Sequence, residues 1–162
     1  MNNGLISISD KIRQIKEAVE TSSYTQKEIQ DIKNEVMQNI NLFADYFNIV
    51  VRMEILASSI SWAPTAVAIY KQMDEERRFR HDLCVRACCS LNEISRSLGL
   101  SDFFPGNIED RHDVASFCGV VVSTLFLHGI HEERSFDTLV STYAEKGVYA
   151  PATQLTEEDL GL

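Results

Sequence analysis

The chain contains few of the residues that interrupt helices. Only seven Gly and three Pro occur in 162 residues, and none lies between Pro64 and Gly99. β-sandwiches and β-barrels need many turns, and turns are rich in these two residues. At this length a single hydrophobic core is sufficient for folding. The sequence therefore predicts one all-α domain over residues 1–162.

Apolar residues recur at spacings of three and four, as they do on the buried face of a helix. Five such stripes lie within residues 8–19, 29–56, 83–98, 114–128 and 136–143. We expect the first to form a short peripheral helix within residues 1–24. Of the other four expected helices, three are long. The pattern predicts an antiparallel helical bundle of about five helices with short connections.

Capping residues mark where these helices begin and end. A Ser, Thr, Asp or Asn side chain satisfies free amides at a helix start, and Gly adopts the left-handed conformation at a helix end. Residues 148–162 follow the last such signal, and we expect them to form a loosely held acidic tail. The expected signals are Thr25 with Glu28 as a capping box, Pro64 in a first turn, Asn107 as an N-cap, and Gly99 and Gly147 as C-caps.

The charge of the chain disfavours two classes of partner. Fifteen Lys and Arg against 24 Asp and Glu give a net charge of −9, and residues 81–162 carry −8 of it. Such a chain repels nucleic acid and anionic lipid. The longest apolar run, residues 120–127, contains Ser and Thr and is far shorter than the ~20 residues of a membrane helix. We expect no nucleic-acid and no membrane partner.

Cysteine spacing indicates the compartment. Three of the four cysteines, Cys84, Cys88 and Cys89, crowd into six residues of one expected helix, where they are poorly placed to join distant segments. The N-terminus has no basic, apolar pattern of a secretory signal. Reduced thiols in a cytoplasmic protein are the simpler interpretation.

A functional site is sought where the helical period places polar residues on an inward face, since such residues need a partner. Continuing the third stripe backwards from Leu83 reaches arginines, and the fourth stripe reaches Arg111 in the same way. We predict a pocket for a phosphate or carboxylate, with His81 as an acid or base. The candidate residues are Asp74, Arg77, Arg80, His81 and Arg111.

A simple hairpin of the third and fourth expected helices would keep Arg77 and Arg111 apart. If the third and fourth helices are antiparallel partners, Arg77 lies about 30 Å from the end of its helix where Arg111 would lie. The two would meet only if the helices crossed steeply or ran parallel through a longer connection.

A structural interpretation of the same residues stays open. Three acid-first pairs are spaced four apart, which favours ion pairs on a solvated helix face: Asp74 with Arg78, Glu76 with Arg80, and Asp82 with Arg86. In a further alternative, Arg77 and Arg111 are buried in structural ion pairs.

Metal chemistry has little support. Cys84, Cys88 and Cys89, or His128 and His131, lack a second ligand pair at the spacing of a closed site. Glu17 with Glu20, and Asp110 with Asp113, only imitate the magnesium ligands of all-α nucleotide pyrophosphohydrolases. Phosphate-loop, nucleophile-elbow and zinc-protease motifs are absent. We predict no metal and no cofactor.

Residues 74–82, followed by Asn92, residues 109–111 and Phe117, form a pattern that resembles an uncharacterised family of small bacterial all-helical proteins. The resemblance covers roughly residues 70–130. It implies a helical fold in a bacterial cytosol. It implies no activity, so no catalytic role is transferred to any residue.

Two functional hypotheses remain. The first is a non-enzymatic protein-interaction or regulatory module that binds another protein or forms a homodimer, because the second helix has apolar residues near a seven-residue repeat and could supply a dimer seam. The alternative is a nucleotide- or phosphate-handling enzyme, or a protein that binds a small anionic ligand. It would use Arg77, His81 and Arg111 with acidic partners from Asp74, Asp110 or Asp113.

Overall fold

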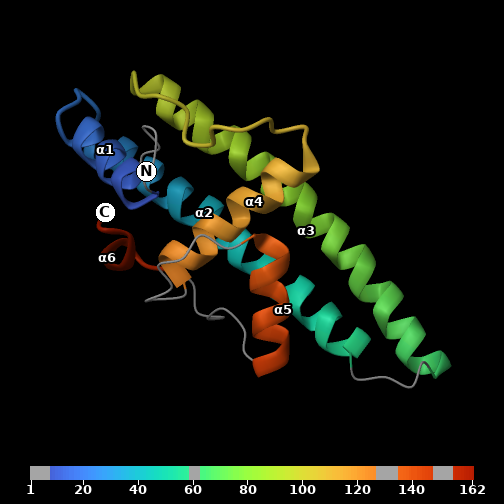
Figure 1. The fold of residues 1–162 in the computed structure, drawn as a ribbon. Helices are drawn as coiled ribbons and strands as arrows, with labels where there is room; N and C mark the ends of the chain where they lie inside the picture. Colours follow the sequence, from blue (N-terminus) through green and yellow to red (C-terminus); the bar gives the residue numbers. More distant parts are fainter. Residues whose placement is uncertain (1–7, 59–62, 127–134, 148–154) are drawn as a thin grey trace.

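The computed structural model describes residues 8–58, 63–126, 135–147 and 155–162. Within these residues the chain is helical and contains no strand, which confirms the all-α prediction (Figure 1). The elements are α1 (Ile8–Glu20), α2 (Gln26–Ser58), α3 (Pro64–Ser97), α4 (Arg111–Val121), the π-helical segment η1 (Val122–Phe126), α5 (Phe136–Lys146) and α6 (Glu157–Leu160).

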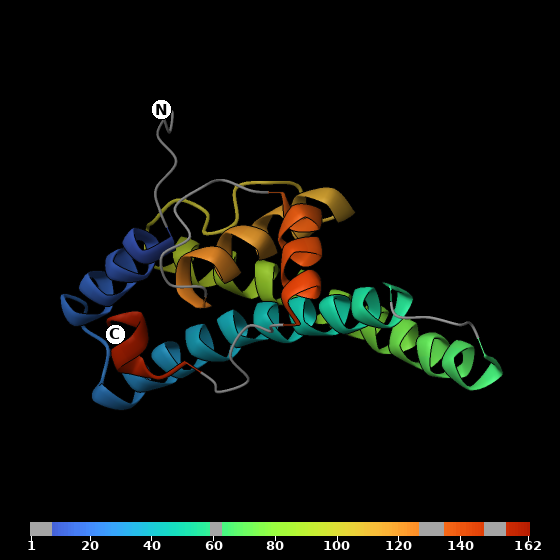
Figure 2. The ribbon, with the colours of Figure 1, turned by 60° about the horizontal axis from the view of Figure 1, so that its bottom comes forward.

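Two long helices form the frame of the molecule. α2 has 33 residues and α3 has 34, and they run side by side in opposite directions (Figures 1 and 2). α4 and α5 pack on one side of this pair, while α1 and α6 lie near the beginning of α2 (Figure 2). α4 has only 11 residues and continues into η1. The architecture is a helical bundle built on the α2–α3 hairpin.

Most helix boundaries follow the expected capping chemistry. The Thr25 hydroxyl accepts a hydrogen bond from the Glu28 amide, and the Glu28 carboxylate accepts one from the Thr25 amide, both at 3.1 Å. Gly99 and Gly147 adopt positive φ angles of 73° and 67° after α3 and α5. These three predictions are confirmed.

The predicted N-cap of α4 is wrong. Asn107 accepts a hydrogen bond from the Glu109 amide at 3.0 Å, which forms a turn before the helix. Asp110 is the cap, because its carboxylate accepts from the amides of His112 and Asp113. A carboxylate is favourable there, since it satisfies amides that have no partner within the helix.

The core lies between the hairpin and the helices on its side. Phe117 of α4 occupies its centre, with ring centroids 5.5 Å from Phe43, 6.2 Å from Phe103 and 4.9 Å from Phe104, all in edge-on geometry. The apolar stripe of α1 is also buried, so this helix belongs to the core more closely than its expected peripheral place suggests.

The central part of the apolar stripe of α2 serves as internal core. Its residues Val36, Ile40, Phe43 and Phe47 are fully buried by other helices of the same chain. The internal-core alternative therefore holds at these residues, and self-association of the protein stays a prediction.

The connection over residues 98–110 leads the chain back along α3 (Figure 1). Asn92 of α3 holds it: the side-chain oxygen accepts from the Phe104 amide at 2.7 Å, and the side-chain amide donates to the Phe104 carbonyl at 3.3 Å. Arg96 donates two further hydrogen bonds to the Asp102 carboxylate, at 2.6 and 2.8 Å. α4 consequently begins beside the middle of α3.

The end of the chain packs closely where it is described. Within residues 155–162, Leu160 is buried, and the Leu155 amide donates to the Asn41 side chain of α2 at 2.9 Å. Thr156 and Asp159 form a capping box for α6. This part of the expected tail is therefore docked on α2. Residues 148–154 lie outside the described residues.

Candidate functional site

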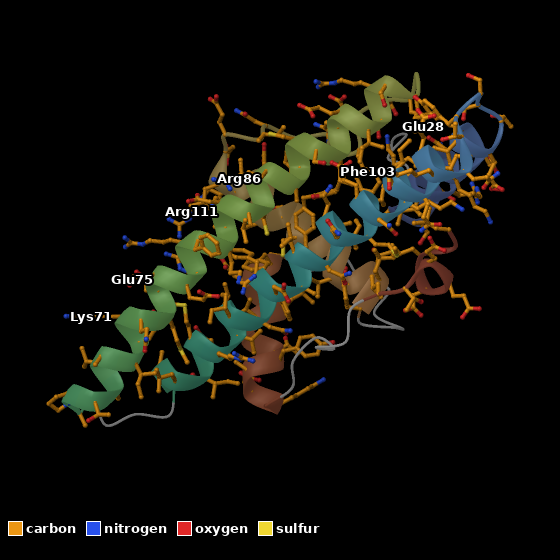
Figure 3. The ribbon with its side chains drawn as sticks, turned by 180° about the vertical axis from the view of Figure 1, so that it is seen from behind. Glu28, Lys71, Glu75, Arg86, Phe103 and Arg111 are labelled. Atoms are coloured by element: carbon orange, nitrogen blue, oxygen red, sulfur yellow. The ribbon has the colours of Figure 1, made fainter. Side chains whose placement is uncertain are left out.

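Cationic side chains gather where the beginning of α4 meets the middle of α3. Five residues line a hollow of about 380 Å³, which we call the arginine hollow. Figure 3 shows Arg111 reaching the level of α3 between the positions of Glu75 and Arg86. The lining residues are Arg77, Arg78, His81, Asp82 and Arg111.

Arg77 is held rigidly in the wall of the hollow. Its side chain is 15% exposed, and its Nε and Nη2 atoms donate to Asp74 Oδ1 at 3.1 and 2.9 Å. Burial opposes the charge of Arg77, but its hydrogen bond to Asp74 and the charge of that carboxylate outweigh burial and raise its pKa. The same hydrogen bond holds the pKa of Asp74 below its usual value. Both groups are charged at neutral pH.

The other two arginines are more available to a ligand. Arg78 has a side chain that is 72% exposed and one ion pair, 3.1 Å from Asp74 Oδ2. Arg111 forms no hydrogen bond or ion pair with any residue that the structure describes. A guanidinium without a partner has all five N–H donors free. Arg111 is therefore the cation most open to binding.

His81 lies between these charges with little access to solvent. Its side chain is 17% exposed, and Nδ1 is 4.0 Å from the Asp82 carboxylate. Nε2 is buried and has no hydrogen-bond partner among the described residues. Burial chiefly, together with the positive charges of Arg111 and Arg77, lowers the pKa of His81 against the opposing charge of Asp82. The imidazole is neutral at pH 7.

Tyr46 of α2 forms the inner boundary of the site. Its ring meets the His81 ring edge-on at 5.6 Å and stacks on Phe136 of α5 at the same centroid distance. Burial chiefly raises the pKa of the Tyr46 phenol, so this side chain is neutral. Tyr46, itself held by Phe136, fixes the position of the His81 ring on the side that faces α2.

The structure brings together three of the five predicted residues, Arg77, His81 and Arg111. Asp74 lies beside them as the partner of Arg77 and Arg78. Arg80 lies outside the hollow, because its guanidinium turns to Glu76 at 2.9 Å and to Asp45 at 3.7 Å.

The predicted set of site residues left out two lining residues, Asp82 and Arg78, although the sequence places Arg78 in a basic cluster with Arg77 and Arg80. Arg78 and Asp82 lie four residues apart, as Arg77 and His81 do, so each pair shares one row along α3 and the two rows are adjacent. This repeated spacing of four was the available signal. Nothing in the sequence indicated that Tyr46 would lie beneath His81.

The meeting of Arg77 and Arg111 depends on the connection over residues 98–110. A short hairpin would have placed Arg111 at the far end of α3. The longer connection returns beside α3, held by Asn92, and delivers Arg111 to the level of His81. Of the two expected conditions for their meeting, the steep crossing is the one this chain meets, because α4 lies across α3 and does not run parallel to it (Figures 1 and 2).

The structural interpretation of these charges is confirmed for two of the three expected pairs, Asp74 with Arg78 and Glu76 with Arg80. The pair of Asp82 with Arg86 does not form within the described part of the chain. The alternative of two buried structural ion pairs fits Arg77 but not Arg111.

Three of the four cysteines, Cys84, Cys88 and Cys118, are buried and have a structural role. The Cys84 thiol donates to the Leu42 carbonyl at 3.6 Å, and the Cys118 thiol to the Phe43 carbonyl at 3.2 Å. Burial raises the pKa of both thiols, and it raises the pKa of Cys88 to about 12. These thiols are therefore protonated and unreactive at neutral pH.

Among the described residues, no group of three or more His, Cys, Asp and Glu is placed to hold a metal ion. Glu17 and Glu20 border a groove between α1 and α6, whereas Asp110 and Asp113 begin α4. The two acidic pairs thus do not face one another. His128 and His131 lie outside the described residues.

Comparison of the chain with protein-family models, with curated proteins and with solved structures gives no match. None of the described helices has both the length and the apolar character needed to cross a membrane. The fold and the hollow together define the protein as an all-α bundle with a cationic surface site.

Proposed function

We propose that the protein binds a small anion that carries a phosphate or carboxylate group, in the arginine hollow between α3 and α4. The observation that carries the proposal is Arg111, a guanidinium without an ion-pair partner among the described residues that faces two further guanidinium groups. A protein with a net charge of −9 has no general reason to gather cations. An anionic ligand supplies one.

The geometry of Arg77 favours binding. Two hydrogen bonds to Asp74 fix its guanidinium, so a ligand meets a group that is already ordered. Less side-chain entropy is lost on binding when the binding group is held in advance. Arg78 and Arg111 then close on the ligand as charged hydrogen-bond donors.

The position of His81 favours binding over chemical conversion. A general acid or base must reach the proton that it transfers. Nε2 of His81 is buried beneath the surface, and Nδ1 faces Asp82 at 4.0 Å. We therefore assign the protein to the non-enzymatic class, as a module whose ligand is held or sensed.

Isothermal titration calorimetry with sodium sulfate and sodium phosphate tests this proposal, with sodium chloride at equal ionic strength as the reference. The decisive variant is Arg111→Ala. We expect it to weaken binding by about tenfold or more, because a charge-assisted hydrogen bond contributes roughly 1.5–3 kcal/mol.

Arg86→Ala is the matched control. Arg86 is an exposed arginine of α3 that lies outside the hollow (Figure 3). We expect its loss to leave the affinity within about twofold. No binding of either anion to the wild type, or equal weakening by both variants, would contradict the proposal.

Self-association is a second candidate, and a different observation favours it. Residues 54–58 of α2 and 64–76 of α3 form an arm that extends beyond α4 and α5 (Figure 2). None of these residues is buried, and the apolar side chain of Ile69 is 41% exposed. Exposed apolar side chains on paired helices are typical of a protein interface.

Light scattering coupled to size-exclusion chromatography measures this association. We expect a dimer for the wild type and a monomer for Ile69→Glu, because the new charge would be buried at the interface. Val120→Glu is the control, since Val120 is similarly exposed but lies on α4. A monomeric wild type would contradict this second candidate.

A further inference from the structure

Resting on the proposed function, we infer that the ligand of the arginine hollow is a dianion such as a terminal phosphate group, and that it binds together with one proton taken up by His81.

The position of His81 couples it to any anion in the hollow. Its imidazole lines the hollow together with all three arginines, so a bound anion lies near both. The ring is mostly buried, and charges interact more strongly across a low-dielectric protein interior than across water. An anion in the hollow therefore acts directly on the protonation of His81.

The charge balance of the hollow sets the charge of the ligand. Three guanidinium groups, with the carboxylates of Asp82 in the lining and Asp74 beside it, leave one positive charge. A monoanion neutralises this charge with His81 unprotonated. A dianion leaves one negative charge, and a protonated His81 neutralises it. Proton uptake thus makes the hollow selective for the dianion.

The groups that face His81 come from three helices. α3 contributes Arg77 and Asp82, α4 contributes Arg111, and α2 contributes the neutral ring of Tyr46. In the free protein, burial chiefly and the charges of the two arginines disfavour a charged imidazole, which lowers the pKa of His81. A bound dianion offsets the charges of these arginines and so removes the second of these two causes.

Linkage gives the direction of the pH effect. A ligand that favours protonated His81 binds more tightly when His81 is already protonated. Affinity for a permanent dianion should therefore rise as the pH falls. With a single titrating group the change is at most about tenfold for each pH unit.

Sulfate is the appropriate probe, because it remains a dianion throughout the neutral range and adds no titration of its own. We expect its dissociation constant to fall by roughly threefold to tenfold between about pH 8 and about pH 6. Acetate, a monoanion, should bind more weakly and show little such change. Phenyl phosphate tests whether the phosphate of an organic molecule binds more tightly than inorganic phosphate.

Calorimetry in two buffers of different ionisation enthalpy measures the proton directly in the unaltered protein. We expect uptake of up to one proton for each sulfate bound near neutral pH. His81→Gln should abolish this uptake, whereas His112→Gln, which alters an exposed histidine in the first turn of α4, should retain it.

The outcomes separate this inference from the proposed function. Sulfate binding that depends on Arg111 but takes up no proton would overturn the inference and leave the proposed function intact. Proton uptake that persists in His81→Gln would also overturn it. If neither sulfate nor phosphate binds, both are overturned.

Discussion

Asn92 is the residue on which the path of the chain toward the hollow depends. It is buried in α3, and its side chain makes both hydrogen bonds to the backbone of Phe104. Asn92→Ala would leave a buried N–H and a buried C=O without partners. We expect a loss of about 2–4 kcal/mol in the free energy of unfolding, measured by urea denaturation.

Asn34→Ala provides the comparison for this change. Asn34 is exposed on α2 and accepts one hydrogen bond from Gln30. Its removal should change the free energy of unfolding by less than about 0.5 kcal/mol. Equal effects of the two substitutions would show that the connection is not fixed by Asn92.

A second prediction concerns the stability of the ligand-free protein and the titration of His81. The folded protein has a lowered pKa for His81, while the unfolded chain has the ordinary value of 6.5. The unfolded state therefore binds more protons in slightly acidic solution. The contribution of neutral His81 to the free energy of unfolding is fully present above about pH 6.5. It is lost as the pH falls through the lower pKa that His81 has in the folded protein.

Urea midpoints at about pH 7.5 and about pH 5.5 measure this loss. We expect His81→Gln to depend less on pH over this range than the wild type. Asp74 and Asp102 do not interfere, because their lowered pKa values place their titration below about 3.8. A variant with the same pH dependence as the wild type would contradict the prediction.

At this scale the sequence predicted part of the site. The helical period placed Arg77 on the inward side of α3 because a local repeat fixes which face a side chain occupies. The sequence did not predict that Arg80 would turn to Asp45 of α2, because that contact depends on how two helices pack. The same limit applies to the contact of Tyr46 with His81.

At the scale of the element, the start of α4 sets the place of Arg111. Asp110 caps this helix through the amides of His112 and Asp113. Asp110→Ala should lower the free energy of unfolding by about 1 kcal/mol, whereas Asp110→Asn should cost much less, because Asn caps nearly as well. Thermal denaturation of the two variants measures the difference.

The same pair of variants bears on the hollow. Loss of the cap frays the first turn of α4, which contains Arg111, so Asp110→Ala should also weaken sulfate binding. Asp110→Asn removes a negative charge near the hollow and should not weaken it. Weaker binding in both variants would show that the charge of Asp110, and not its cap, matters.

The element scale also explains which parts of the fold the sequence could predict. Each helix carries its own period and capping residues, so the helices over residues 8–20 and 26–58 were recognisable from local pattern alone. The cap of α4 was predicted at Asn107, although Asp110 is an equally good capping residue. Capping preference alone does not distinguish the two positions, and the structure shows that the Asp110 carboxylate accepts the free amides.

At the scale of the whole molecule, burial is uneven along the hairpin. The second half of α3 is covered by the rest of the chain, and its buried residues begin only at Cys84. The arm, residues 54–58 and 64–76, contains no buried residue. Segments with few buried contacts open locally at lower cost than the global free energy of unfolding.

Hydrogen exchange followed by mass spectrometry tests this gradient within one continuous helix. We expect amides of residues 68–76 to exchange at least about tenfold faster than those of residues 84–97 in a dilute monomer. Self-association through the arm would cover residues 68–76, so their exchange should slow as the protein concentration rises, while residues 84–97 stay unchanged. Uniform protection along α3 at every concentration would contradict the gradient, because the arm would then need no partner to be stable.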